Sequence, residues 1–86
     1  MKRLTAHLDV AQVTAWWPEH DVWFTESSVD VRAVTKIDSA GVAFLVKWTK
    51  TCLQTQQKPL EIFGVSPQLR QLIELYGVSE LFALNS

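Results

Sequence analysis

The stretch Ile37-Asp38-Ser39-Ala40-Gly41-Val42-Ala43-Phe44-Leu45 decides how this chain folds. A carboxylate and three small residues stand directly before an apolar run, which predicts the N-terminus of an amphipathic helix over residues 39–56. Either Asp38 or Ser39 is suited to cap this helix, because both side chains accept hydrogen bonds from the first free backbone N–H groups. The small side chains of Ser39, Ala40 and Gly41 leave the helix end sterically open, with its positive dipole end exposed.

The predicted helix over residues 39–56 carries an apolar arc of about half its circumference, which is wider than one core-facing stripe. At about 100° per residue, Phe44 and Trp48 lie beyond the edge of that stripe. Two alternatives follow for these rings: either they face a partner protein, or the sheet or the aromatic residues of segment 18–28 cover them. The core stripe comprises Val42, Leu45, Val46, Thr49, Cys52 and Leu53, and the polar face comprises Lys47, Lys50 and Gln54.

Strands and helices alternate along the rest of the chain. Asp9 is a suitable cap for a first helix that Pro18 ends, and Ser66-Pro67 is a strong start for a last one. The order predicts an α/β fold: a small mixed sheet with crossover helices. The expected elements are strands over 2–8, 29–33 and 60–65, helices over 10–17 and 67–76, a loop or partial turn of helix over 18–28, and a short last helix or packed tail over 78–84.

Length and composition predict one small domain over residues 1–86 and disfavour several functions. The net charge is −1 and basic residues do not cluster, so nucleic-acid binding is not expected. The longest apolar run, Val42 to Val46, is far shorter than the roughly 20 residues of a membrane span, so direct membrane insertion is not expected. A single cysteine and the lack of a signal-peptide pattern predict a cytoplasmic location.

No group of side chains has the spacing of a catalytic or metal site. His7 and His20 stand alone, and Cys52 falls on the apolar stripe, where an unreactive thiol is expected. We therefore expect no enzyme activity, no metal and no cofactor. Ser39 is the remaining candidate. Its hydroxyl either caps the helix or faces a partner protein, and phosphorylation there would add about −1.5 to −2 charge beside Asp38.

The order of these segments resembles the signature of STAS domains, the fold of bacterial anti-sigma-factor antagonists. That signature has an apolar-Asp-apolar strand, here Val29-Asp30-Val31, and then Asp-Ser-x-Gly at the start of the main helix, here Asp38-Ser39-Ala40-Gly41. The likeness spans nearly the whole chain and implies a STAS-like fold whose N-terminal strand is shortened or missing. The other matching segments are Leu8-Asp9, Leu60-Glu61-Ile62-Phe63-Gly64-Val65, Pro67-Gln68-Leu69-Arg70 and Leu75-Tyr76-Gly77-Val78.

Within the family, the chain is similar to the small cytoplasmic subunit of the Mla phospholipid ABC transporter of Gram-negative bacteria. Leu75-Tyr76 and Trp16-Trp17 carry this likeness. It implies a non-catalytic subunit that binds the cytoplasmic ATPase subunit, supports its assembly and activity, and lies peripheral to the inner membrane through that complex. On this interpretation the partner-binding residues are Asp38, Ser39, Ala40, Gly41, Phe44, Lys47, Trp48 and Trp17.

Two departures from the family pattern concern the edge of the sheet. The family strand has glycine before its acidic residue and leucine, whereas His7 precedes Leu8 here. The family also has an additional N-terminal strand, which this chain begins too late to contain in full. An exposed strand edge invites pairing with another chain, so a homodimer through this edge is a further prediction.

An anti-sigma-factor antagonist is the alternative function. In that case a kinase-like anti-sigma factor phosphorylates Ser39, and the added charge breaks the complex. Serine at this position permits such regulation, whereas Trp16-Trp17 and Tyr76 favour the transporter subunit. Stoichiometric phosphoserine in native protein would favour the switch, and its absence would favour the transporter subunit.

Overall fold

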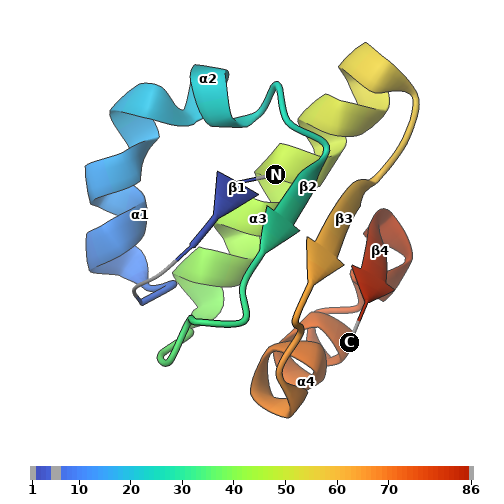
Figure 1. The fold of residues 1–86 in the computed structure, drawn as a ribbon. Coiled ribbons are helices and arrows are strands. Elements are labelled where there is room, and N and C mark those ends of the chain that lie inside the picture. The colour runs from blue at the N-terminus through green and yellow to red at the C-terminus, as the bar shows by residue number, and fades with distance from the viewer. Residues whose placement is uncertain (1, 5–6, 86) are drawn as a thin grey trace.

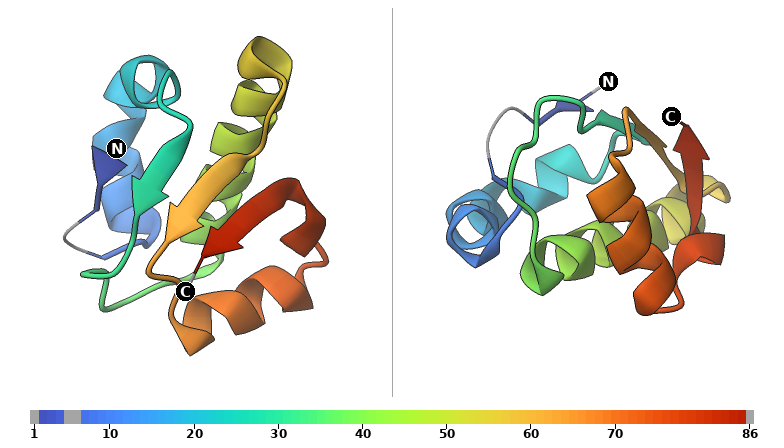
Figure 2. Two further views of the ribbon diagram at one scale, coloured as in Figure 1. Left: turned by 45° about the vertical axis from the view of Figure 1, so that its right-hand side comes forward. Right: turned by 90° about the horizontal axis from the view of Figure 1, so that it is seen from below.

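The computed structural model describes residues 2–4 and 7–85 as a four-stranded sheet with helices packed on one of its faces (Figures 1 and 2). The strands lie in the order β1-β2-β3-β4, and every pairing among them is parallel. The predicted α/β class is confirmed, although the described strands form a parallel sheet and not a mixed one. The strands are β1 (Lys2–Arg3), β2 (Ser28–Asp30), β3 (Leu60–Phe63) and β4 (Phe82–Asn85).

The helices begin where the capping residues predict. Asp9 accepts a hydrogen bond from the Gln12 N–H (3.1 Å), and Ser66 accepts one from the Leu69 N–H (3.1 Å). These bonds satisfy backbone donors that have no partner within the helix. The elements are α1 (Val10–Trp16), α2 (His20–Trp23), α3 (Ser39–Gln56) and α4 (Pro67–Leu75), with 3₁₀ turns η1 (Trp17–Glu19) and η2 (Ser79–Leu81).

Two segments differ from their predicted structure. Residues 18–28 are mostly helical, because η1 continues from α1 with Pro18 in its first turn and α2 follows directly. Residues 82–85 form the strand β4, so a short last helix or packed tail is wrong for them. The Thr49 hydroxyl accepts a hydrogen bond from the Leu60 N–H (2.9 Å) and donates one to the Leu81 carbonyl (2.5 Å). These bonds join α3, β3 and η2, and the chain end pairs with β3 through a ladder between residues distant in the sequence.

The core lies between the sheet and the helices. Val29 and Ile62 are fully buried and directly paired in the sheet, and Leu4 and Leu8 are buried as their alternation predicts. Thr5 and Ala6, which belong to the same predicted strand, lie outside the described residues. Past this gap, the chain pairs again through a parallel bridge between Leu8 and Ile37. That bridge places the start of α1 next to the start of α3.

Candidate partner-docking site

The N-terminus of α3 is capped by Asp38 and not by Ser39. One carboxylate oxygen of Asp38 accepts a hydrogen bond from the Gly41 N–H (3.1 Å), which is the bond of an N-cap. The other oxygen accepts one from the Val10 N–H (3.2 Å) in the first turn of α1. The two sequence alternatives are therefore resolved, and one carboxylate satisfies donors of two neighbouring helices.

The Ser39 hydroxyl is available for a contact with another molecule. Ser39 is the first residue of α3, and its side chain is exposed. Within residues 2–4 and 7–85, its hydroxyl makes no hydrogen bond. The interpretation of Ser39 as an ordinary capping serine is therefore wrong, because Asp38 already fills that role.

Gly41 is a packing residue and not a contact residue. It is buried, and a Cβ at this position would lie 2.6 Å from the Leu8 Cγ and would also collide with the Leu8 carbonyl group. The absence of a side chain lets α3 approach the backbone of Leu8 closely. The expected role of Gly41 in direct partner contact is wrong, whereas Asp38 and Ala40 are half-buried and remain at the surface.

Phe44 and Trp48 are also core residues. Their side chains are 1% and 0% exposed, so the expectation that they contact a partner directly is wrong, and the alternative cover by segment 18–28 is confirmed. The Trp48 indole N–H donates to the Glu26 carbonyl (2.8 Å), which fixes the loop after α2 onto α3. We call the six packed rings the aromatic cluster: Trp16, Trp17, Trp23, Phe24, Phe44 and Trp48, with neighbouring centroids 5.2–6.4 Å apart.

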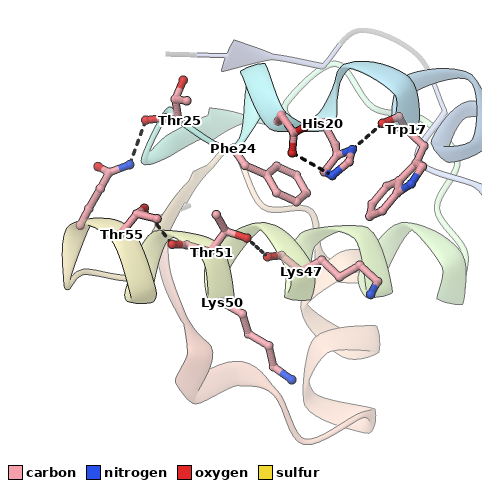
Figure 3. A pocket seen from close by; sticks show the side chains of 10 residues that line it. Trp17, His20, Phe24, Thr25, Lys47, Lys50, Thr51 and Thr55 are labelled. Atoms are coloured by element: carbon pink, nitrogen blue, oxygen red, sulfur yellow. Dashed lines mark hydrogen bonds and ion pairs between the residues drawn. The ribbon is translucent and has the colours of Figure 1, made fainter.

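Trp17 and Lys47 remain accessible, as expected. Trp17 belongs to the aromatic cluster but is 40% exposed, and its ring stacks on the His20 imidazole with centroids 3.9 Å apart. The Lys47 side chain is exposed, and its Nζ lies 5.8 Å from the Trp17 ring (Figure 3). A cation near an aromatic ring is weakly attracted to it. Of the expected contact residues, these two and Ser39 are the ones with exposed side chains.

Two grooves flank the outer face of α3. The α2–α3 groove has a volume of about 710 Å³ and lies between α3 and the segment that carries Trp17, His20 and Phe24 (Figure 3). The α3–α4 groove has a volume of about 450 Å³ and begins at Ser39. Its lining is mostly apolar: Ser39, Val42, Ala43, Val46, Lys47, Lys50, Tyr76 and Val78.

The α3–α4 groove contains residues that the sequence did not assign to a site. Val46 is only half-buried, although it was expected in the core, and Ala43 is exposed. Tyr76 is 49% exposed and follows the last residue of α4. The signal for Tyr76 was its likeness to the family, whereas Ala43 and Val46 become visible only when α4 is placed beside α3.

Titratable side chains do not gather into a reactive group. Burial raises the pKa of the Cys52 thiol, and the Lys58 ammonium partly opposes this shift. The thiol therefore stays neutral and is a poor nucleophile at physiological pH. Within the described residues, no three His, Cys, Asp or Glu side chains are close enough to hold a metal ion. The surface around Ser39 combines an exposed hydroxyl with an apolar groove, which suits it to binding.

The comparisons with known proteins agree with this architecture. A family model described as "Mlab, STAS domain" matches residues 3–84, which is nearly the whole chain. None of the curated proteins matches the chain significantly. In the described part of the chain, no helix is both long enough and apolar enough to cross a membrane.

Proposed function

The chain belongs to the STAS domain family, and from that premise we propose that it binds and supports the ATPase subunit of an ABC transporter. The transporter we propose moves phospholipids to maintain the lipid asymmetry of a Gram-negative outer membrane. STAS domains are generally non-catalytic binding modules, and the chain would act through contact alone. Its proposed place is the cytoplasmic side of the inner membrane, where its partner complex would hold it.

The exposed hydroxyl of Ser39 is the observation that carries this proposal. It stands at the open end of α3, and it is not used as a cap because Asp38 has that role. It also borders the apolar α3–α4 groove, which Tyr76 lines at its other wall. A hydroxyl beside an apolar hollow can accept or donate one hydrogen bond while the hollow receives apolar side chains of a partner.

Trp17 and Tyr76 are the aromatic residues best placed to anchor a partner. Their side chains are 40% and 49% exposed. The rings of the aromatic cluster other than Trp17 belong to the core or pack against it. Partly exposed aromatic side chains are enriched among residues that carry most of the binding energy of an interface. Both residues lie in the segments that carry the likeness to the transporter subunit.

Affinity capture from the cells that produce this chain tests the proposal. A tagged chain is expected to recover an ABC-type ATPase, and mass spectrometry identifies it. A Ser39→Arg variant, which places a long cation at the edge of the α3–α4 groove, is expected to lose at least 90% of that recovery. A Glu61→Arg variant is the matched control, because Glu61 is exposed on β3 and lines neither groove. Recovery of a sigma-regulating kinase in place of an ATPase would contradict the proposal.

The exposed position of Ser39 also favours the alternative function, an anti-sigma-factor antagonist. Its hydroxyl is accessible to a kinase, and the N-terminus of the 18-residue helix α3 favours an added negative charge. Intact mass spectrometry of chain isolated from its native cells distinguishes the two functions. Stoichiometric phosphorylation at Ser39 would favour the antagonist, and an unmodified Ser39 would favour the transporter subunit.

A homodimer through the edge strand β1 stays a prediction. β1 has only two residues and pairs with β2 on one side. It therefore offers few backbone groups to a second copy. Light scattering on the purified chain measures the mass directly: a dimer is expected from edge pairing, and a monomer at high micromolar concentration would exclude it.

A further inference from the structure

Two lysines of α3 form a cationic ridge between the two grooves. Lys47 and Lys50 are both exposed, and both line the α2–α3 groove and the α3–α4 groove. In Figure 3, Lys50 points away from α2, and Lys47 extends along α3 beneath the Trp17 ring. Residues three apart on a helix share one face, so the two side chains leave the same face of α3 although their ends point in different directions.

No carboxylate of the described residues pairs with this cationic ridge. The ion pairs within residues 2–4 and 7–85 join other groups, such as Arg3 with Asp30. Asp21 lines the α2–α3 groove, but its carboxylate lies 3.1 Å from the Nε2 atom of His20. The positive charge of Lys47 and Lys50 is therefore left for solvent or for another molecule.

The surface beside the cationic ridge is apolar toward α4 and mixed toward α2. Toward α4 lie Ala43, Val46 and Tyr76, whereas toward α2 the exposed ring of Trp17 lies among polar side chains. These polar residues are His20, Asp21, Thr25, Thr51, Thr55 and Gln56. A complementary surface would thus have carboxylates in the middle, apolar side chains on the α4 flank and an apolar group against Trp17.

We propose that the ATPase subunit docks on this chain with an acidic, apolar-flanked element that covers the cationic ridge. The proposal rests on the proposed function and specifies the chemistry of the partner. Asp or Glu side chains of that element would meet Lys47 and Lys50, and its apolar side chains would enter the α3–α4 groove and pack on Trp17. The contact would then extend from Ser39 across α3 to Trp17. Opposite charges at such an interface raise the association rate and make it sensitive to salt.

Charge reversal of the cationic ridge tests the proposal. The ATPase captured with the wild-type chain is purified, and its binding to variant chains is measured. The double variant Lys47→Glu and Lys50→Glu is expected to bind the purified ATPase at least tenfold more weakly, mainly through slower association. Its association rate should also fall less steeply with salt than that of wild type. Lys36→Glu with Lys58→Glu is the matched control, because these exposed lysines line neither groove, and it should bind within twofold of wild type.

Carbodiimide cross-linking gives a second, independent measurement. The reagent joins a lysine amine to a carboxylate that is already in contact with it, and peptide mass spectrometry locates the bond. Links from Lys47 or Lys50 to Asp or Glu of the ATPase are expected. Wild-type affinity of the double variant, or links from Lys36 and Lys58 only, would overturn the acidic-element proposal while leaving the proposed function intact. If wild-type chain binds no ATPase, the proposed function fails and this inference fails with it.

Discussion

The two sides of α3 meet very different surroundings although they belong to one helix. On the side toward α1 and α2, Phe44 and Trp48 are covered by the aromatic cluster and are at most 1% exposed. On the side toward α4, Ala43 is exposed and Val46 is half-buried, and both line a groove that starts at Ser39. The aromatic residues are thus inside, and the small and aliphatic ones are accessible.

The difference shows that a wide apolar arc does not identify the binding face of a helix. Large rings on the arc need cover, and the segment from Trp17 to Phe24 provides it. The smaller side chains leave a hollow where α3 and α4 diverge. Docking is therefore expected to begin beside Ser39 and to reach the exposed Trp17, without direct contact to Phe44.

The largest expected effect is on the covered side. Phe44 packs against every other ring of the aromatic cluster, so Phe44→Ala is expected to lower the free energy of unfolding by about 3–5 kcal/mol. Urea denaturation followed by far-UV circular dichroism measures this. Tyr76→Ala on the open side should change it by less than about 1 kcal/mol. If the Phe44→Ala protein kept its full stability but lost partner binding, Phe44 would belong to the binding surface and not to the core.

A smaller effect is expected where α3 touches Leu8. Gly41→Ala places a Cβ against the backbone of Leu8 and is expected to cost about 1–3 kcal/mol, measured as a lower thermal midpoint. Ala43→Ser is the matched control on the exposed face of the same helix, with an expected cost below about 0.5 kcal/mol. Equal midpoints for the two variants would show that α3 can move away from Leu8 at no cost.

The cap comes next. Asp38→Ala removes the acceptor of both the Gly41 and the Val10 N–H groups and is expected to cost about 1–2 kcal/mol in denaturant unfolding. Asp21→Ala is the control: its side chain is 92% exposed and pairs only with His20, so its change should be below about 0.5 kcal/mol. A neutral Asp38→Ala variant would mean that Ser39 takes over as the cap.

The smallest effect on stability is expected at Ser39 itself. Ser39→Ala removes a hydroxyl that has no hydrogen-bond partner among the described residues and should leave the free energy of unfolding within about 0.5 kcal/mol of wild type. Binding to the captured ATPase, measured by surface plasmon resonance, should nevertheless weaken severalfold. Unchanged affinity together with unchanged stability would place the docking surface away from Ser39.

Much of the fold could be predicted from the sequence because its signals are local. The caps Asp9 and Ser66, the break at Pro18 and the apolar alternation around Val29 each act within a few residues. The strand β4 could not be predicted in this way, because its pairing joins residues distant in the sequence, such as Leu60 and Phe82. The helical structure of 17–23 likewise goes with contacts distant in the sequence, because Trp23 and Phe24 pack against Phe44 and Trp48 of α3.

The candidate site could be predicted only in part. Asp38-Ser39 at the start of a helix is visible in the sequence, and so is the likeness that points to Trp17 and Tyr76. Periodicity places Phe44 and Trp48 at the edge of the arc, but it does not say which neighbouring segment covers that edge. Leu53, expected in the core, is 39% exposed, whereas the adjacent Cys52 is 0% exposed. The choice between Asp38 and Ser39 as cap likewise required the geometry of both side chains.

The carboxylate of Asp38 couples the docking surface at the start of α3 to the start of α1. Since a single side chain holds the first turns of both α1 and α3, a force on the start of α3 is passed to α1 through two hydrogen bonds and no intervening residue. Engagement of Ser39 would therefore reduce the fraying of the N-terminal helix some thirty residues earlier in the chain. Slower amide hydrogen exchange at Val10 in the complex would report that reduced fraying.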